Sequence, residues 1–243
     1  MLEAFQDFFA PPRHMLFLVL AAWLGLTLAE RRSERYGISK DDLNNITFYG
    51  LVAFVIGGRL MSILQNPAIF AKKPLDVISI NPDLLDPFGA LAFAFLAAVI
   101  IGQRKQLGFW NSLDALTPFF AVLAIGLGLS HLAEGTIHGT PTSVPWGIEF
   151  QGDAQHPVSL YEVLASFLVF GLVWRFGANP RPGITFLSFT ALTAASQLLL
   201  QAFKANATIL FEQYRGEQVL AWLALFFCFV LLEGRLRSES NTG

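Results

Sequence analysis

Apolar runs separated by short polar connections make up most of this chain. Seven of these runs approach the roughly 20 residues that a helix needs to cross the hydrocarbon core of a bilayer. They are Met15–Leu28, Ile46–Leu64, Leu84–Gly102, Leu113–Leu132, Val158–Phe176, Ile184–Phe203 and Val219–Leu232. Backbone groups cannot stay unpaired in lipid, and the chain lacks the alternating ten-residue pattern of a membrane barrel. The pattern therefore predicts an all-α polytopic membrane protein with about seven transmembrane helices.

The amino-acid composition agrees with a membrane protein rather than a soluble domain. Hydrophobic residues make up 54% of the chain and charged residues 14%, whereas a soluble domain carries roughly 25% charged residues. The net charge of -2 comes without a basic stripe, so we expect no nucleic-acid partner. Cys228 is the only cysteine, which excludes an internal disulfide. We expect no cofactor and no bound metal.

Charged residues at the ends of the apolar runs predict the direction of the chain through the membrane. The first twelve residues hold Glu3 and Asp7 but no Lys or Arg, which is not the pattern of a cleaved signal peptide. A basic cluster, Arg31, Arg32 and Arg35, follows the first apolar run instead. With that cluster in the cytoplasm, ten Lys and Arg residues lie in cytoplasmic segments and five on the other side. The positive-inside rule then predicts an outer N-terminus and a cytoplasmic C-terminus.

The chain shows no internal repeat, and its apolar runs follow one another without a long polar linker. We expect residues 1–237 to form a single transmembrane helical domain. Its longest connection, an outer loop at 133–157, carries no Lys or Arg. Residues 238–243 are predicted to be a polar tail. Two prolines and a glycine in the stretch 179–183 predict a tight cytoplasmic turn.

Polar residues gather near the outer ends of several predicted helices. The set is Arg59, Asp86, Ser130, His131, Glu134, His156, Tyr161, Glu162, Gln197, Gln201 and Lys204. Gln197, Gln201 and Lys204 follow i, i+4, i+7 spacing, which places them on one face of a helix. Polar and charged side chains at that depth are costly unless they face the bundle interior and find partners. The set therefore predicts a polar pocket open to the outer leaflet, in which Arg59 pairs with Asp86 or Glu162.

A distinctive motif lies in the outer loop and just after it. It comprises Gly139, Pro141-Thr142, Pro145-Trp146-Gly147 and His156-Pro157-x-x-Leu160-Tyr161-Glu162. This stretch resembles the outer loop of the prolipoprotein diacylglyceryl transferases, which reads close to NGE-x-x-G-R-PT-x-x-PWG and then RHPSQLYE. Most of the chain shares the resemblance, because Gly57-Gly58-Arg59-Leu60 sits where that family has its GGR helix. The chain is identified as a divergent member.

The resemblance implies a role in lipoprotein biogenesis as a multi-pass protein of the bacterial inner membrane. Enzymes of that family transfer a diacylglyceryl group from phosphatidylglycerol to the thiol of a lipobox cysteine in a preprolipoprotein, and glycerol phosphate leaves. The reaction needs a base or hydrogen-bond relay for the thiol, and cations for the phosphate. It also needs a cavity that opens sideways to lipid.

The chain departs from the family motifs at most of the positions that carry the chemistry. The histidine of the family's FHGG motif falls at Phe88. The arginine of its GR-x-GN motif falls at Gly128, and the asparagine of that motif at His131. The glutamate of NGE falls at Thr136, and the arginine of the sixth helix at Gln197.

Two functions follow from these residues. The first is a diacylglyceryl transferase with a rebuilt site, in which His131 or His138 is the base. In that site Arg59, Gln197, Gln201, Lys204 and Gly139 would bind lipid or phosphate, while Asp86, His156, Tyr161 and Glu162 would be structural or would position the substrate. The second is a catalytically degenerate relative that binds phospholipid or lipoprotein, or serves as a subunit of a membrane complex.

Three other interpretations of the polar residues stay open. Each residue alone is compatible with ordinary interfacial polarity, with Arg59 snorkelling and Lys204 capping a helix end. His131, Glu134 and His138 have a spacing compatible with zinc, with His156 nearby in sequence, but they match none of its strong signatures. A transporter is disfavoured, because the chain shows neither an inverted repeat nor paired broken helices.

Overall fold

The computed structural model describes residues 2–78, 84–135, 137–150, 153–176, 181–205, 209–210 and 214–237. Its contacts divide the chain into two compact units. Unit 1 consists of Met1–Arg31 and Leu116–Gly243, and unit 2 consists of Arg32–Ala115.

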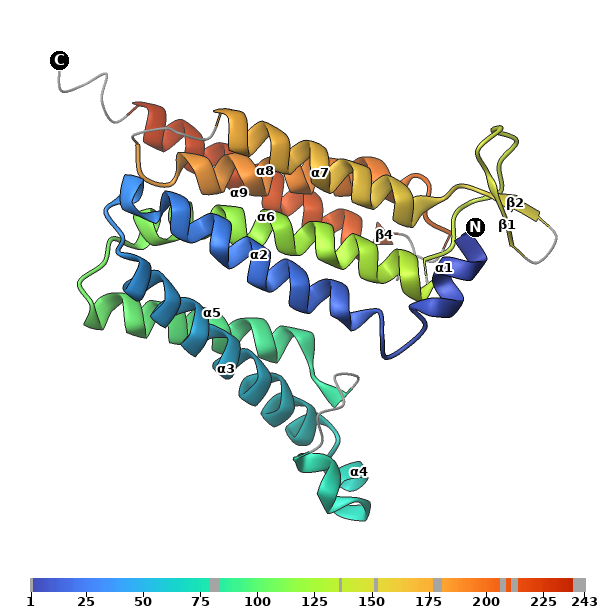
Figure 1. Cartoon of the computed structure of the whole chain (residues 1–243), viewed down its shortest axis with the longest axis horizontal. Helices are drawn as coiled ribbons and strands as arrows, with labels where there is room; N and C mark the ends of the chain where they lie inside the picture. The colour runs from blue at the N-terminus through green and yellow to red at the C-terminus, as the bar shows by residue number, and fades with distance from the viewer. Residues whose placement is uncertain are drawn as a thin grey trace. The chain divides into compact units, whose positions relative to one another are not determined.

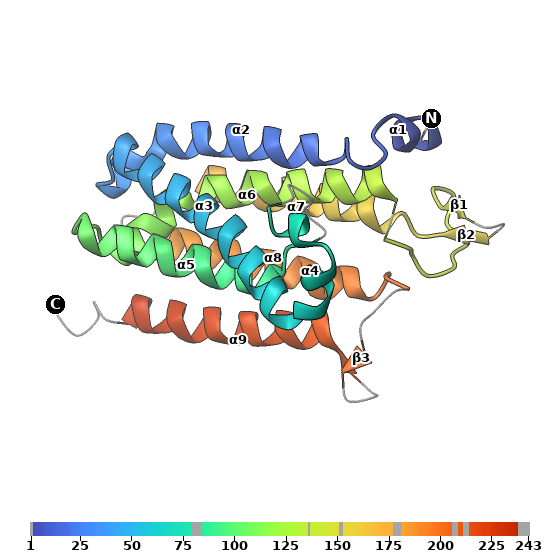
Figure 2. The ribbon, with the colours of Figure 1, turned by 90° about the horizontal axis from the view of Figure 1, so that it is seen from below.

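Unit 1 is a helical bundle with antiparallel hairpins toward one end (Figure 1, Figure 2). Its helices are α1 (Leu2–Phe8), most of α2 (Met15–Ser33) and of α6 (Phe109–Glu134), α7 (Val158–Phe176), α8 (Ile184–Gln201) and α9 (Gly216–Arg237). Its strands are β1 (Ile148–Phe150), β2 (Asp153–Gln155), β3 (Ile209–Leu210) and β4 (Tyr214–Arg215). β1 pairs with β2, with Glu149 opposite Ala154, and β3 pairs with β4. The outer loop that the sequence predicts at 133–157 is therefore partly built of strands.

The core of unit 1 lies between α6, α7 and α8. Ala121 of α6, Val169 and Val173 of α7 and Phe189 of α8 are buried against one another. On another face of α6, a Cβ atom at Gly126 would lie 2.3 Å from the Cβ of Ala21 and 2.9 Å from the carbonyl oxygen of Phe17. Small residues allow such close contact between helix backbones in membrane proteins. α6 is thus held between α2 and the pair α7 and α8.

Unit 2 is built on the packing of α3 against α5. Its elements are the short 3₁₀ turns η1 (Glu34–Tyr36) and η2 (Pro74–Val77), and the helices α3 (Lys40–Gln65), α4 (Pro67–Lys72) and α5 (Pro87–Arg104). A Cβ atom at Gly57 would lie 2.2 Å from the Cβ of Phe93, so the two helices touch closely there. Asp42 near the start of α3 forms an ion pair of 3.2 Å with Lys105 just after α5. Contacts at both places show that the two helices run antiparallel.

Arg59 and Asp86 lie where α3 approaches the start of α5. Arg59 is buried, and its Nη1 donates to the carbonyl oxygen of Leu84 at 3.4 Å. Asp86 caps α5, because its Oδ1 accepts a hydrogen bond of 2.6 Å from the backbone nitrogen of Gly89. Its Oδ2 accepts from Nε2 of Gln65 at 3.3 Å. Asp86 therefore has a structural function in unit 2, while the pairing of Arg59 with Asp86 or Glu162 stays a prediction.

Replacing Asp86 with alanine is expected to destabilise the start of α5. Loss of an N-cap acceptor typically costs about 1 kcal/mol, so Asp86→Ala should lower the thermal unfolding midpoint of the purified protein in detergent. Asp86→Asn keeps a side-chain oxygen at the same position and should stay close to the original midpoint. Equal losses in the two variants would contradict the capping role.

The described part of the chain contains six helices that are long and apolar enough to cross a membrane: α3, α5, α6, α7, α8 and α9. The first predicted segment also forms a helix, α2, but its 19 residues include Glu30, Arg31 and Arg32. These three charges leave α2 outside the six, and the six agree with the expected number of about seven. The prediction of an all-α polytopic membrane protein is confirmed. The outer N-terminus and cytoplasmic C-terminus stay predictions.

The helices do not end where the apolar runs end. α2 continues to Ser33, α3 begins at Lys40 and α9 covers Gly216–Arg237, because polar residues continue a helix beyond the hydrocarbon. α8 is shorter than predicted, since it ends at Gln201 and Lys204 lies beyond it. The predicted tail at 238–243, part of the predicted turn at 179–183 and Thr136 lie outside the described residues.

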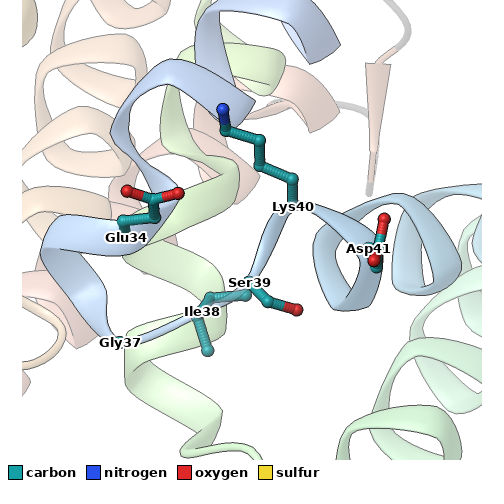
Figure 3. A pocket seen from close by; sticks show the side chains of 6 residues that line it. All are labelled: Glu34, Gly37, Ile38, Ser39, Lys40 and Asp41. Atoms are coloured by element: carbon teal, nitrogen blue, oxygen red, sulfur yellow. The ribbon is translucent and has the colours of Figure 1, made fainter.

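A shallow pocket of about 510 Å³ lies in unit 2 at the turn between η1 and α3 (Figure 3). It is lined by Glu34, Gly37, Ile38, Ser39, Lys40 and Asp41. Gly37 makes the turn with a φ of 71°. Only Ile38 among the lining residues is buried, and the others are exposed. Solvated side chains of this kind line an ordinary loop surface, so buried polar groups in unit 1 are better candidates for chemistry.

Candidate functional site

Three polar side chains from three helices meet inside unit 1. Nδ1 of His131, near the end of α6, lies 2.9 Å from Oε2 of Glu162, which is in the second turn of α7. Gln197, in the last turns of α8, donates from Nε2 to the other carboxylate oxygen, Oε1, at 3.4 Å. The Glu162 side chain is 8% exposed and that of His131 is 28% exposed. A buried carboxylate is thus held between an imidazole and an amide.

The contact with Glu162 sets the chemical state of His131. An ionised carboxylate only accepts hydrogen bonds, so Glu162 favours the tautomer of His131 that carries its proton on Nδ1. The other ring nitrogen, Nε2, then holds a lone pair. Carboxylate–histidine pairs of this kind orient the imidazole and stabilise the imidazolium that forms when it takes a proton. The pair can therefore act as a general base.

A cavity of about 110 Å³ adjoins Glu162 and Gln197 between α6, α7 and α8. Its polar lining comes from Glu162, Ser166, Thr193, Ser196 and Gln197. A water molecule takes up about 30 Å³ in the liquid. The cavity therefore has room for a few waters, and it is far too small for the acyl chains of a lipid.

A second cluster joins the outer loop to the ends of α7 and α8. Trp146 donates from its indole Nε1 to the Tyr161 hydroxyl at 2.7 Å. The same hydroxyl lies 3.3 Å from Nδ1 of His156. The ring of Phe203 packs edge-on against His156, with centroids 4.9 Å apart. Tyr161 is thus the common partner that holds the loop in place.

The segment after α6 passes as an extended chain between β2 and the residues that follow α8. Gly139 forms an isolated β-bridge with Lys204. Thr140 donates from its backbone nitrogen to the carbonyl of Phe203 at 2.8 Å, and its own carbonyl accepts from His156 at 3.1 Å. The carbonyl of His138 accepts from the backbone nitrogen of Ala205 at 2.9 Å. This pairing explains why the chain leaves the helical path before Lys204.

Substitution of Gly139 should disrupt this pairing. A Cβ atom there would lie 2.0 Å from the carbonyl oxygen of His156, which is backbone and cannot rotate away. We expect Gly139→Ala to cost about 1–3 kcal/mol, the usual range for overpacking, and to increase protease cleavage of the outer loop. Gly147→Ala is the control in the same loop, because its nearest contact would be 3.1 Å from the Thr142 methyl group. Equal cleavage of the two variants would contradict the close packing.

A third cluster lies where α8 ends and α9 begins. Oε2 of Glu217 accepts hydrogen bonds from Nε2 of Gln201 and, at 3.2 Å, from Nζ of Lys204. Arg215 donates from Nη1 to the carbonyl oxygens of Gln201 and Lys204, the latter at 3.1 Å. Carbonyls at the end of a helix need such partners, because they have none within the helix. The guanidinium of Arg215 therefore holds the end of α8.

The structure places most of the predicted site residues of unit 1 in three separate clusters. His131, Glu162 and Gln197 form the first cluster, His156 and Tyr161 the second, and Gln201 and Lys204 the third. Among the described residues, no group of three or more His, Cys, Asp or Glu side chains gathers as metal ligands do. The zinc interpretation of His131, Glu134 and His138 is therefore not supported. Arg59 and Asp86 belong to unit 2, so their place in one pocket with His131 stays a prediction.

Sequence reasoning did not single out Glu217 or Trp146 as partners of these clusters. Glu217 lies in the first turn of α9, where an acidic residue is common at any helix start. Its relation to Lys204 depends on the path of the chain between α8 and α9. Trp146 was part of the loop motif, but nothing in the motif indicated that its indole binds Tyr161.

Comparison with known proteins finds one family along most of the chain. A family model described as prolipoprotein diacylglyceryl transferase matches residues 13–233. The chain is 30% identical over 198 residues to a phosphatidylglycerol–prolipoprotein diacylglyceryl transferase of Geobacter sulfurreducens, covering 78% of this chain and 76% of the relative. It is 30% identical over 176 residues to the proteins of that name from Azoarcus sp. and Aromatoleum aromaticum, covering 70% of this chain and 66% of each relative.

Proposed function

Since this chain belongs to the prolipoprotein diacylglyceryl transferase family, we propose that it transfers a diacylglyceryl group from phosphatidylglycerol to a lipobox cysteine thiol. It would act in the bacterial inner membrane on a secreted preprolipoprotein. The observation that carries the proposal is the contact of 2.9 Å between Nδ1 of His131 and Oε2 of Glu162. This contact supports His131 as the general base of the reaction.

In the proposed reaction, Nε2 of His131 takes the proton of the cysteine thiol. The sulfur then attacks the terminal carbon of the diacylglyceryl group, so a C–S bond forms and the C–O bond to the phosphate breaks. Glycerol phosphate leaves with the bonding electron pair, and the imidazolium returns its proton to the leaving phosphate or to water. Glu162 stabilises the imidazolium while it exists, because a buried carboxylate beside it balances its charge.

The substitution of the family's histidine supports a different base in this chain. Phe88 stands at that position, and its ring cannot accept a proton. His131, by contrast, stands where the family motif has an asparagine. A general base must reach the proton that it removes, and the partly exposed ring of His131 meets that condition better than a wholly buried one would.

The loss of the family's arginine at Gly128 is linked to the same pair. A Cβ atom at Gly128 would lie 3.1 Å from Cγ2 and 3.2 Å from the backbone nitrogen of Val163. α6 therefore packs closely on α7 beside Glu162. This close approach brings His131, one turn further along α6, within hydrogen-bond distance of Glu162. Glycine in place of the family's arginine thus allows the close helix packing that forms the His131–Glu162 pair.

The proposal is tested by incubating the purified protein, in nanodiscs that contain phosphatidylglycerol, with a peptide that carries a lipobox cysteine. Mass spectrometry of the peptide should show the addition of one diacylglyceryl group. The same peptide with serine in place of the cysteine should stay unmodified, because the alcohol is a much weaker acid than the thiol. Absence of any modified cysteine peptide would overturn the proposal of a transferase.

One observation favours the alternative of a relative that binds phospholipid without transferring it. Lys204 is paired with Glu217, and Arg215 is bound to backbone carbonyls. Both cations of this cluster are thus already engaged within the protein, which weakens their action on a leaving phosphate. In this alternative, phosphatidylglycerol or a lipoprotein would be retained by the purified protein while the peptide stays unmodified. The chain would then serve as a binding protein or as a subunit of a larger membrane assembly.

A further inference from the structure

Two buried donors converge on a single exposed carboxylate at the start of α9. Nε2 of Gln201 and Nζ of Lys204 both point to Oε2 of Glu217. Gln201 is 1% exposed and the Lys204 side chain 11%, whereas the Glu217 side chain is 50% exposed. The donors are therefore fixed in the protein, and the acceptor is the member of the cluster that can leave into solvent.

Gln201 also has a buried acceptor atom. Its Oε1 is inaccessible to solvent and accepts a hydrogen bond from none of the described residues. A buried polar atom without a partner destabilises a structure, so native proteins rarely keep one unless a ligand or water satisfies it. The amide nitrogen of Gln201 thus has a hydrogen-bond acceptor, whereas its amide oxygen has no donor among the described residues. A ligand with both an anionic oxygen and a hydroxyl group could form hydrogen bonds with both atoms.

We propose that Glu217 occupies the binding site for the phosphate of an anionic lipid, and that it must leave Lys204 and Gln201 before the lipid can bind. The inference rests on the proposed function, which supplies phosphatidylglycerol as the lipid. A phosphate oxygen takes the place of Oε2 of Glu217 and accepts hydrogen bonds from Nζ of Lys204 and Nε2 of Gln201. A hydroxyl group of the glycerol headgroup donates to Oε1 of Gln201.

The chemistry of the surrounding groups fits a phosphate better than it fits the carboxylate. Hydrogen bonds from a charged donor to an anionic oxygen are stronger than neutral ones, and a phosphate offers more oxygens than the one that Glu217 uses. The first turn of α9 adds backbone N–H groups at the positive end of a 22-residue helix. Arg215 contributes a further positive charge while it stays on the carbonyls at the end of α8.

The site lies at the right place along α8 for the proposed reaction. Gln201 follows Gln197 by four residues, so the two amides lie on one face about 6 Å apart along the helix axis. Gln197 contacts Glu162, which holds His131. A phosphate on Gln201 and Lys204 would thus lie one helical turn from Gln197, whose amide contacts the carboxylate partner of the proposed base. Glu217 accordingly acts as a specificity and gating residue rather than as a catalytic one.

The test measures lipid binding and does not need the transfer reaction. The purified chain in neutral detergent is titrated with short-chain phosphatidylglycerol or phosphatidylcholine, and bound lipid is counted by native mass spectrometry. Glu217→Gln should raise the affinity for phosphatidylglycerol roughly three- to tenfold, which corresponds to about 0.6–1.4 kcal/mol, the usual net contribution of one hydrogen bond. The affinity for phosphatidylcholine should not change. A gain in affinity cannot result from misfolding.

Matched variants separate this site from general charge effects. Glu233→Gln removes the same charge at the other end of α9, where Glu233 pairs with Arg237, and should leave lipid affinity unchanged. Lys204→Gln should lower the affinity for phosphatidylglycerol. The proposal is overturned if Glu217→Gln has no effect, or if Glu233→Gln has the same effect. Soluble glycerol phosphate serves as a further competitor. If it bound more tightly than the lipid, the assignment to a lipid headgroup would be wrong.

The outcomes also separate this inference from the proposed function. If the peptide is modified but Glu217→Gln binds phosphatidylglycerol no more tightly, only the gating role of Glu217 is wrong. If Glu217→Gln binds more tightly while the peptide stays unmodified, the lipid site is supported and the transferase is not.

Discussion

Replacing His131 with alanine is expected to lower the rate of diacylglyceryl transfer about 10²- to 10⁴-fold. This is the usual contribution of a positioned general base. Alanine removes the imidazole that takes the thiol proton, so Glu162 has no base to orient. The rate is measured by mass spectrometry of the lipobox peptide under conditions in which the unchanged protein modifies it. The thermal unfolding midpoint of the variant shows whether it still folds.

His138→Ala is the informative control for this experiment, because His138 is the rival base that the sequence suggests. The His131 assignment predicts that His138→Ala retains nearly all of the activity. Glu162→Gln should fall between the two variants, since the amide can still contact the imidazole but cannot balance its positive charge. If His138→Ala abolished transfer while His131→Ala did not, the roles of the two histidines would have to be exchanged.

The largest expected effect on stability comes from Gly126→Leu in α6. Its Cβ would overlap the Cβ of Ala21 and approach the carbonyl oxygen of Phe17, both of which belong to α2 and have no freedom to rotate away. Overpacking of this kind typically costs about 1–3 kcal/mol and sometimes more. We expect a large loss of folded protein in detergent, measured as the monodisperse fraction in size-exclusion chromatography.

Gly171→Leu in α7 is the control, because it makes the same substitution at a glycine that does not pack against another helix. A Cβ at Gly171 meets no atom of the described residues within 4 Å, and the position is exposed. This variant should be recovered in nearly the same yield as the unchanged protein. If both leucine variants were recovered equally well, α2 and α6 would not be packed as closely as the structure has them.

The sequence predicted the helices well, because each apolar run is long compared with the uncertainty of its ends. It predicted the rotation of the helices poorly. Hydrophobic residues surround most of these helices on all sides, so no polar stripe indicates which face points inward. For this reason the sequence did not indicate which side chains contact Glu162. The structure shows that His131 and Gln197 do, while the predicted pairing of Arg59 with Asp86 or Glu162 stays a prediction.

The residue at which α8 ends could not be predicted from the sequence, for a different reason. The residues between Gln201 and Lys204 are compatible with a helix, and the predicted run continued to Phe203. The helix ends earlier because the outer loop pairs with the chain at Lys204, more than sixty positions after Gly139. A contact between residues so distant in the sequence overrides local preference. Lys204 also contacts Glu217, and no motif in the sequence indicates this contact.

The close packing at Gly128 has a consequence for how this chain can change. A Cβ atom there would already meet Cγ2 and the backbone nitrogen of Val163 at 3.1 Å and 3.2 Å. A larger side chain that moved α6 away from α7 would also separate His131 from Glu162. The small residue at position 128 and the imidazole–carboxylate pair therefore depend on the same helix packing, and a change in one is expected to change the other.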